Sequence, residues 1–126
     1  MNQNKNIGII KNTPAADFVR IRFPGRNIRE YATVETALKA LRKGRIDIFI
    51  HDAPVLWWAA SKYSDELVSP PQILNNQLFA WGFRKEDALL RNAVNKLVIQ
   101  WKTDGTIKRI INTWIPNIFE QPVSKP

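Results

Sequence analysis

Cysteine is absent from this chain of 126 residues, and histidine occurs once, as His51. Without cysteine the chain forms no disulfide and no thiolate metal site, although this says little about its compartment. A single histidine, with no carboxylates clustered around it in the sequence, does not supply the ligands that a metal needs. Glycine-rich phosphate loops and carboxylate pairs at a catalytic spacing are also missing. We therefore predict a protein that is not an enzyme, with no catalytic residue, no metal and no cofactor.

Long apolar runs are missing as well. No stretch approaches the roughly 20 apolar residues that span a bilayer. The start of the chain, MNQNKN, lacks the apolar segment of a secretory signal. Two alternatives follow: the chain is cytoplasmic as written, or a leader and further sequence have been removed.

Acidic residues are scarce, with 11 of them against 19 basic residues and a net charge of +8. The basic residues cluster at Arg20, Arg22, Arg26 and Arg29, and at Lys39, Arg42, Lys43 and Arg45. Such clusters attract nucleic acid or anionic lipid over long distances. No recognition helix, zinc-finger spacing or RNA-binding signature accompanies them. Solvated helix and turn positions are the simpler interpretation, and nucleic-acid binding is the least favoured function.

The chain alternates short apolar runs with amphipathic segments over its first half. Strands are expected at 7–10, at 28–31, over the apolar run that follows Gly44 and ends at Asp52, and at 67–68, and helices at 14–23, 33–43 and 54–63. Thr13 and Thr33 stand where helix N-caps belong, and Gly44 stands where the second helix should end. This order predicts an α/β fold with a parallel sheet. We expect residues 1–126 to form a single domain.

The strand that leads into Asp52 is the most informative segment, GRIDIFIHDAP. A near-continuous apolar run is typical of a buried parallel strand, and ligands of open α/β sheets bind beyond the carboxyl ends of the strands. Asp52 is then a negative charge placed where an amine would be met. The alternative is that Asp52 caps the helix that Pro54 opens, and the two roles are compatible.

The last third of the chain has a different pattern. A strand is expected at 77–84, followed by two helices whose apolar stripes run from Leu89 to Trp101 and from Ile107 to Trp114. Trp81, Trp101 and Trp114 lie in this segment. An exposed apolar surface formed by such side chains usually marks a contact with a partner protein. A homodimer, through exchange of the C-terminal helices, would cover it.

Three segments together carry a resemblance: IGIIKNTPAADF, TALKALRKGRIDIFIHDAP and LFAWGFRKEDALLRNAVNKLVIQWKTDGTIKRIINTWI. In this order they resemble the family 3 extracellular solute-binding proteins, the amino-acid receptors of ATP-driven (ABC) importers. The resemblance implies a lobe of the type 2 periplasmic-binding-protein fold over residues 7–74. Residues 75–116 would form a hinge-crossing strand and two helices, and residues 117–126 a tail. Most of the family's first lobe has no counterpart here.

The resemblance also implies a binding site. Asp52 matches the family carboxylate that holds the ligand's α-ammonium, and His51 matches a position that can touch the ligand's side chain. Thr13 and the next two residues, Pro14 and Ala15, match the helix start that receives the ligand carboxylate. Pro14 has no N–H to offer there, which weakens this anion site.

Two further positions depart from, or add to, the family pattern. Asn12 stands where the family commonly has glycine. Lys11 would line the cleft as a point charge that compensates for the N–H missing at Pro14, and a solvated lysine is the alternative.

The function implied is non-catalytic binding of an amino acid or related cationic amine. An importer membrane subunit would be the partner, and the periplasm or cell exterior the location. The alternative is a vestigial or truncated lobe that serves as a homo-oligomeric interaction module.

Overall fold

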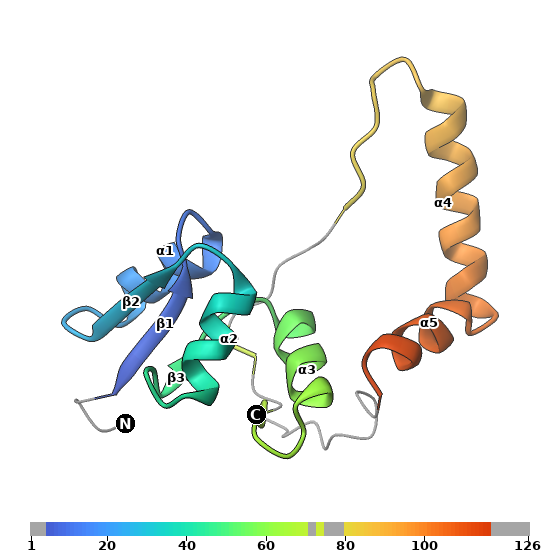
Figure 1. Ribbon diagram of the computed structural model, residues 1–126. Helices are drawn as coiled ribbons and strands as arrows, with labels where there is room; N and C mark the ends of the chain where they lie inside the picture. The colour runs from blue at the N-terminus through green and yellow to red at the C-terminus, as the bar shows by residue number, and fades with distance from the viewer. Residues whose placement is uncertain (1–4, 71–72, 75–79, 117–126) are drawn as a thin grey trace. The chain divides into compact units, whose positions relative to one another are not determined.

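A computed structural model describes residues 5–70, 73–74 and 80–116 (Figure 1). The chain divides into two compact units, Met1–Pro70 and Pro71–Pro126, and each is described here by itself. The expected single domain, its division at residues 74 and 75 and the family roles of its segments stay predictions. The expected tail at 117–126 lies outside the described residues.

The first unit contains a parallel sheet of three strands. These are β1 (Asn6–Ile10), β2 (Asn27–Tyr31) and β3 (Ile48–Phe49), in the spatial order β2-β1-β3. Ile7 of β1 pairs with Ile28 on one side and with Ile48 on the other. Helices α1 (Pro14–Arg22) and α2 (Val34–Arg42) make the crossovers, and α3 (Ala53–Lys62) follows β3. The predicted α/β class with a parallel sheet is confirmed.

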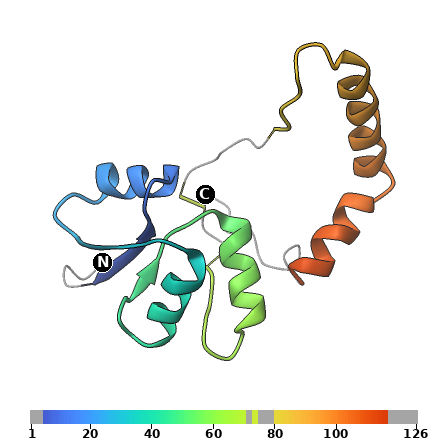
Figure 2. The same cartoon turned by 45° about the horizontal axis from the view of Figure 1, so that its top comes forward.

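Helices cover both faces of this sheet (Figures 1 and 2). On one face, Ile7 and Ile9 are buried against Ala16 and Val19 of α1. The opposite face carries a second buried cluster, drawn from β1, α2, β3, α3 and the loop before β3: Ile10, Ala37, Leu38, Ala40, Ile46, Phe49 and Ala59. Central strand β1 therefore contributes apolar side chains to both clusters, as its continuous apolar run predicts.

The helix boundaries follow the caps expected from the sequence. The hydroxyl oxygens of Thr13 and Thr33 accept hydrogen bonds from Ala16 N (3.2 Å) and Thr36 N (3.3 Å). Gly44 has a φ of +66°, the left-handed conformation that suits glycine beyond a helix end. Local side-chain chemistry thus sets both ends of α2.

In the described part of the chain, residues of two expected strands are irregular, and a third strand is shorter than expected. Residues 67–68 are irregular: Leu67 N donates to Tyr63 O (2.8 Å) and its side chain packs on the core, whereas Val68 is 90% exposed. Residues 80–84 are irregular too, and the rest of that expected strand, 77–79, lies outside the described residues. β3 has two regular residues, although Asp47 N and Ile50 N also bond to β1 carbonyls.

The second unit contains α4 (Ala88–Thr103) and α5 (Thr106–Trp114), as the two apolar stripes predict. Gly105, with a φ of +80°, makes the turn between them. Neither helix has a buried residue. Among the described residues, no helix has the length and apolar character needed to cross a membrane.

Candidate functional site

The predicted site residues lie in the first unit, at the carboxyl edge of the sheet. All three strands are parallel, so Lys11, Tyr31 and His51 lie just beyond or at the same end of the sheet. Lys11 N donates to Tyr31 O (3.1 Å), which extends the pairing of β1 and β2 to Lys11. The first turns of α1, α2 and α3 begin at this edge as well. It is the place where ligands of open α/β sheets bind.

Asp52 occupies the N-cap position of α3, but its side chain makes no capping hydrogen bond. The backbone carbonyl of Asp52 accepts from Val55 N (3.0 Å) and Leu56 N (3.2 Å), so the helix begins here without help from the carboxylate. The side chain is 39% exposed, and Oδ2 lies 3.8 Å from the Nδ1 atom of His51. The interpretation of Asp52 as a side-chain cap is therefore wrong, and its carboxylate is available to a ligand.

His51 is mostly buried beside Asp52, with 11% of its side chain exposed. Its Nδ1 accepts a hydrogen bond from Asp52 N (2.7 Å), so the neutral ring carries its proton on Nε2. The imidazole ring packs against the Phe49 ring, with the two ring centroids 5.6 Å apart. This contact was not predicted, although two residues apart on a strand share one face. His51 thus orients the start of α3, and Nε2–H is its remaining donor.

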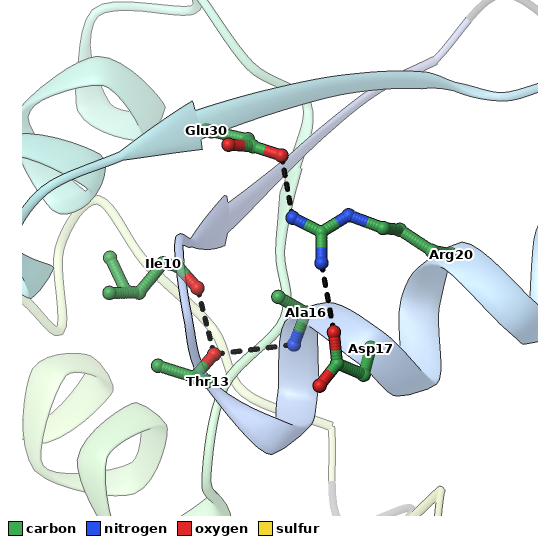
Figure 3. Close-up of polar contacts among 6 residues, drawn as sticks. All are labelled: Ile10, Thr13, Ala16, Asp17, Arg20 and Glu30. Carbon is green, nitrogen blue, oxygen red and sulfur yellow. Dashed lines mark hydrogen bonds and ion pairs between the residues drawn. The ribbon is translucent and has the colours of Figure 1, made fainter.

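The start of α1 has few donors left for an anion (Figure 3). The Thr13 hydroxyl donates to Ile10 O (2.8 Å) and accepts from Ala16 N (3.2 Å), so both of its roles are taken. Pro14 has no N–H. Ala15, at the second helical position, keeps a backbone N–H with no partner inside the helix. The predicted anion site at Thr13, Pro14 and Ala15 therefore amounts to one backbone donor.

Asn12 has a φ of +60°, the left-handed conformation that asparagine tolerates better than most residues. This explains why asparagine can stand where the family commonly has glycine. The turn it makes joins Lys11, at the end of the β1 pairing, to the Thr13 cap.

The two basic clusters are partly neutralised by acidic neighbours. Arg20 pairs with Asp17 (2.9 Å) and Glu30 (2.6 Å), and the hydrogen bond to Glu30 is the main reason that its pKa is raised (Figure 3). Arg42 binds Glu66 through two hydrogen bonds of 2.9 and 2.6 Å. These pairs favour solvated, structural positions over a nucleic-acid surface.

One open hollow lies along α5 in the second unit, with a volume of about 430 Å³. Gly105, Lys108, Arg109, Asn112 and Thr113 line it. Its lining has no carboxylate to hold an ammonium group, so it does not match the predicted site.

Comparison with protein-family models finds no match. Curated proteins do match. The glutamate-binding protein GluB of Corynebacterium glutamicum is 26% identical over 104 residues, which is 79% of this chain and 35% of GluB. The L-cystine-binding protein TcyJ of Escherichia coli is 26% identical over 112 residues, 89% of this chain and 42% of TcyJ. The chain therefore spans less than half the length of these relatives.

Relatives of another kind also share part of the sequence. Membrane-bound lytic murein transglycosylase F of Desulfosudis oleivorans is 31% identical over 80 residues, 64% of this chain and 17% of that protein. The relatives are thus mainly binding proteins, with a cell-wall enzyme among them.

Solved structures give the fold. An ancestral cationic amino acid solute-binding protein overlays with a TM-score of 0.72 at 24% identity, over 90% of this chain and 48% of that one. The chain resembles the family 3 solute-binding proteins. A mutant of the ArgBP protein from T. maritima has a TM-score of 0.66 at 21% identity, over 89% of this chain and 48% of its own. The fold of this chain thus matches about half the length of a family 3 solute-binding protein. The predicted fold is confirmed.

Proposed function

We propose that the protein binds an amino acid or a related cationic amine at the carboxyl edge of the sheet, without catalysis. The observation that carries the proposal is the Asp52 carboxylate, which stands at a helix start without capping it. A carboxylate in a partly desolvated site forms a strong, directional hydrogen bond with an ammonium group. Names of relatives such as GluB and TcyJ, which bind glutamate and L-cystine, support a ligand of this class.

The other residues of the proposed site act around Asp52. His51 positions the start of α3 and offers Nε2–H, and Lys11 and the start of α1 at Thr13, Pro14 and Ala15 face the acidic end of the ligand. One lobe supplies half of a clamp, so we expect modest affinity unless a second chain or lobe closes over the ligand. By resemblance, the protein would act in the periplasm or outside the cell and deliver its ligand to the membrane subunit of an ABC importer.

Thermal unfolding in the presence of each amino acid and of polyamines tests this proposal. A ligand at about 100 times its dissociation constant adds about 2.7 kcal/mol to the stability of the chain. Asp52→Asn should lower the affinity for the best ligand about tenfold or more, because it removes the negative charge from the hydrogen bond to the ammonium group.

Asp65→Asn is the matched control, since Asp65 is an exposed aspartate of the same unit. It should bind the ligand as the wild-type chain does. Stabilisation that survives Asp52→Asn, or no stabilisation by any amino acid or polyamine at millimolar concentration, would refute the proposed site.

The second candidate function is a homo-oligomeric interaction module. The observation that favours it is the apolar surface of α4 and α5, where no residue is buried. We call this the C-terminal apolar surface; it comprises Leu89, Leu90, Leu97, Ile99, Ile110 and Trp114, which are all exposed. A second copy of the chain could cover it, and the Asp52 site would then be vestigial.

A further inference from the structure

Helices α4 and α5 each carry an apolar stripe that the second unit does not bury. On α4 the stripe runs from Leu90 to Trp101, and on α5 it runs from Ile107 to Trp114. The two helices contact each other, yet neither has a fully buried residue. Leu90 and Trp114 are among the exposed members of the C-terminal apolar surface. An exposed apolar surface of this kind usually marks a binding face.

The charged side chains of these two helices are all basic. The sequences of α4 and α5 contain no aspartate or glutamate and five basic residues: Arg91, Lys96, Lys102, Lys108 and Arg109. Helical spacing places Arg91 and Lys102 on one side of the α4 stripe and Lys96 on the other. In the described part of the chain, none of these three forms an ion pair. Positive charge therefore borders the apolar stripe on both sides.

The described acidic residues of the second unit lie outside the helices and have contacts of their own. Glu86 and Asp87 precede α4, and Arg84 Nε lies 4.0 and 2.9 Å from their carboxylates. Asp104, between the helices, accepts a hydrogen bond from Thr106 N (2.9 Å). Carboxylates before a helix also interact favourably with its dipole. The basic residues of α4 are therefore not neutralised by these carboxylates.

This combination of apolar and basic faces fits the surface of an anionic membrane. Amphipathic helices that lie in the membrane interface carry leucine and tryptophan on one side and lysine and arginine on the other. Tryptophan prefers the depth of the head groups, and long basic side chains can reach the phosphates while their apolar stems stay buried. A second copy of the chain would instead bring like charges together. The charge pattern therefore favours anionic lipid over a second copy as the occupant of this surface.

We propose that α4 and α5 bind the surface of an anionic membrane through the C-terminal apolar surface and the basic residues beside it. The inference goes beyond the proposed function, because Asp52 lies in the first unit and the membrane contact lies in the second. The homo-oligomeric module uses the same apolar surface, so experiment can distinguish the two occupants.

Cosedimentation of the full chain with lipid vesicles tests this contact. The vesicles consist of phosphatidylcholine alone, or of phosphatidylcholine and phosphatidylglycerol in equal parts. We expect binding to the mixed vesicles and much weaker binding to the neutral ones. Lys96→Gln combined with Lys102→Gln should weaken binding to the mixed vesicles about 25-fold, since each basic residue near an anionic surface contributes about fivefold. Trp114→Gln keeps the charge and should weaken binding roughly tenfold, because it removes an apolar side chain from the interface.

Lys39→Gln combined with Lys43→Gln is the matched control, because both are exposed lysines of the first unit and their loss changes the net charge equally. This pair should leave vesicle binding unchanged, and so should Asp52→Asn. The proposal is overturned if the folded wild-type chain does not bind the mixed vesicles at low ionic strength, or if the control pair weakens binding as much as the α4 pair does. A stable dimer that stays in the supernatant would overturn it too, and would assign the surface to a second copy.

Discussion

At the scale of single residues, Asp47 shows how a polar side chain in an apolar strand segment is used. Its carboxylate accepts from Asn6 N (2.8 Å) and pairs with Lys5 (3.0 Å), which ties the entry of β3 to the entry of β1. The backbone hydrogen bond, followed by Lys5, lowers the pKa of Asp47 below its ordinary value of 3.8. These contacts exist in the folded chain and are lost on unfolding.

The lowered pKa of Asp47 predicts an acid-dependent contribution to stability. The ionised carboxylate stabilises the folded chain above the ordinary aspartate pKa of 3.8, and the contribution is lost as the pH falls through the lower folded value. Asp47→Asn should therefore be less stable than the wild-type chain at pH 7. Urea unfolding between pH 7 and pH 2 should show this difference shrinking below about pH 4. A difference that stays constant over this range, or one that Asp65→Asn reproduces, would contradict the prediction.

At the scale of elements, helix boundaries were predictable because their signals are local. Thr13, Thr33 and Gly44 act within one turn of the chain, and each occupies the boundary that the sequence predicts. Strands depend on partners that are distant in the sequence. An apolar pair such as Leu67 and Val68 satisfies the strand pattern, but in the structure Leu67 packs on the core beyond a turn. The side-chain geometry around Asp52 and His51 could not be predicted from local sequence patterns either, because these patterns do not give the positions of individual atoms.

The two threonine caps provide a matched pair that separates stability from binding. Thr33→Ala and Thr13→Ala each remove a side-chain acceptor from a helix start, and each should cost about 1 kcal/mol in the free energy of unfolding. Thr33 caps α2 outside the proposed site, so Thr33→Ala should leave amino-acid affinity unchanged. Thr13→Ala should also lower the affinity for the ligand, since it loosens the turn between Lys11 and α1. Denaturant unfolding and ligand titration of both variants check this, and equal effects on affinity would refute the distinction.

At the scale of the whole molecule, the two units differ in how their apolar surface is used. The first unit buries its apolar residues in two clusters around β1. Within the second unit, helices of 16 and 9 residues have no fully buried residue. Helices of this length are marginal in water without packing. The C-terminal apolar surface therefore has to be covered for these helices to be stable, and under the second candidate function the cover is another copy of the chain.

Covering by a second copy predicts that the mass of the chain in solution depends on this surface. Light scattering after size exclusion should give a dimer for the wild-type chain, and Trp114→Glu should shift it toward the monomer. Trp114 is 68% exposed, and burial of a tryptophan at an interface is typically worth about 2 kcal/mol or more, which corresponds to a dissociation constant about 30-fold higher. Val68→Glu is the control, because Val68 is 90% exposed and lies in the first unit. A wild-type chain that is monomeric at every concentration, or a dimer that both variants weaken equally, would remove the homo-oligomer from consideration and leave another partner for α4 and α5.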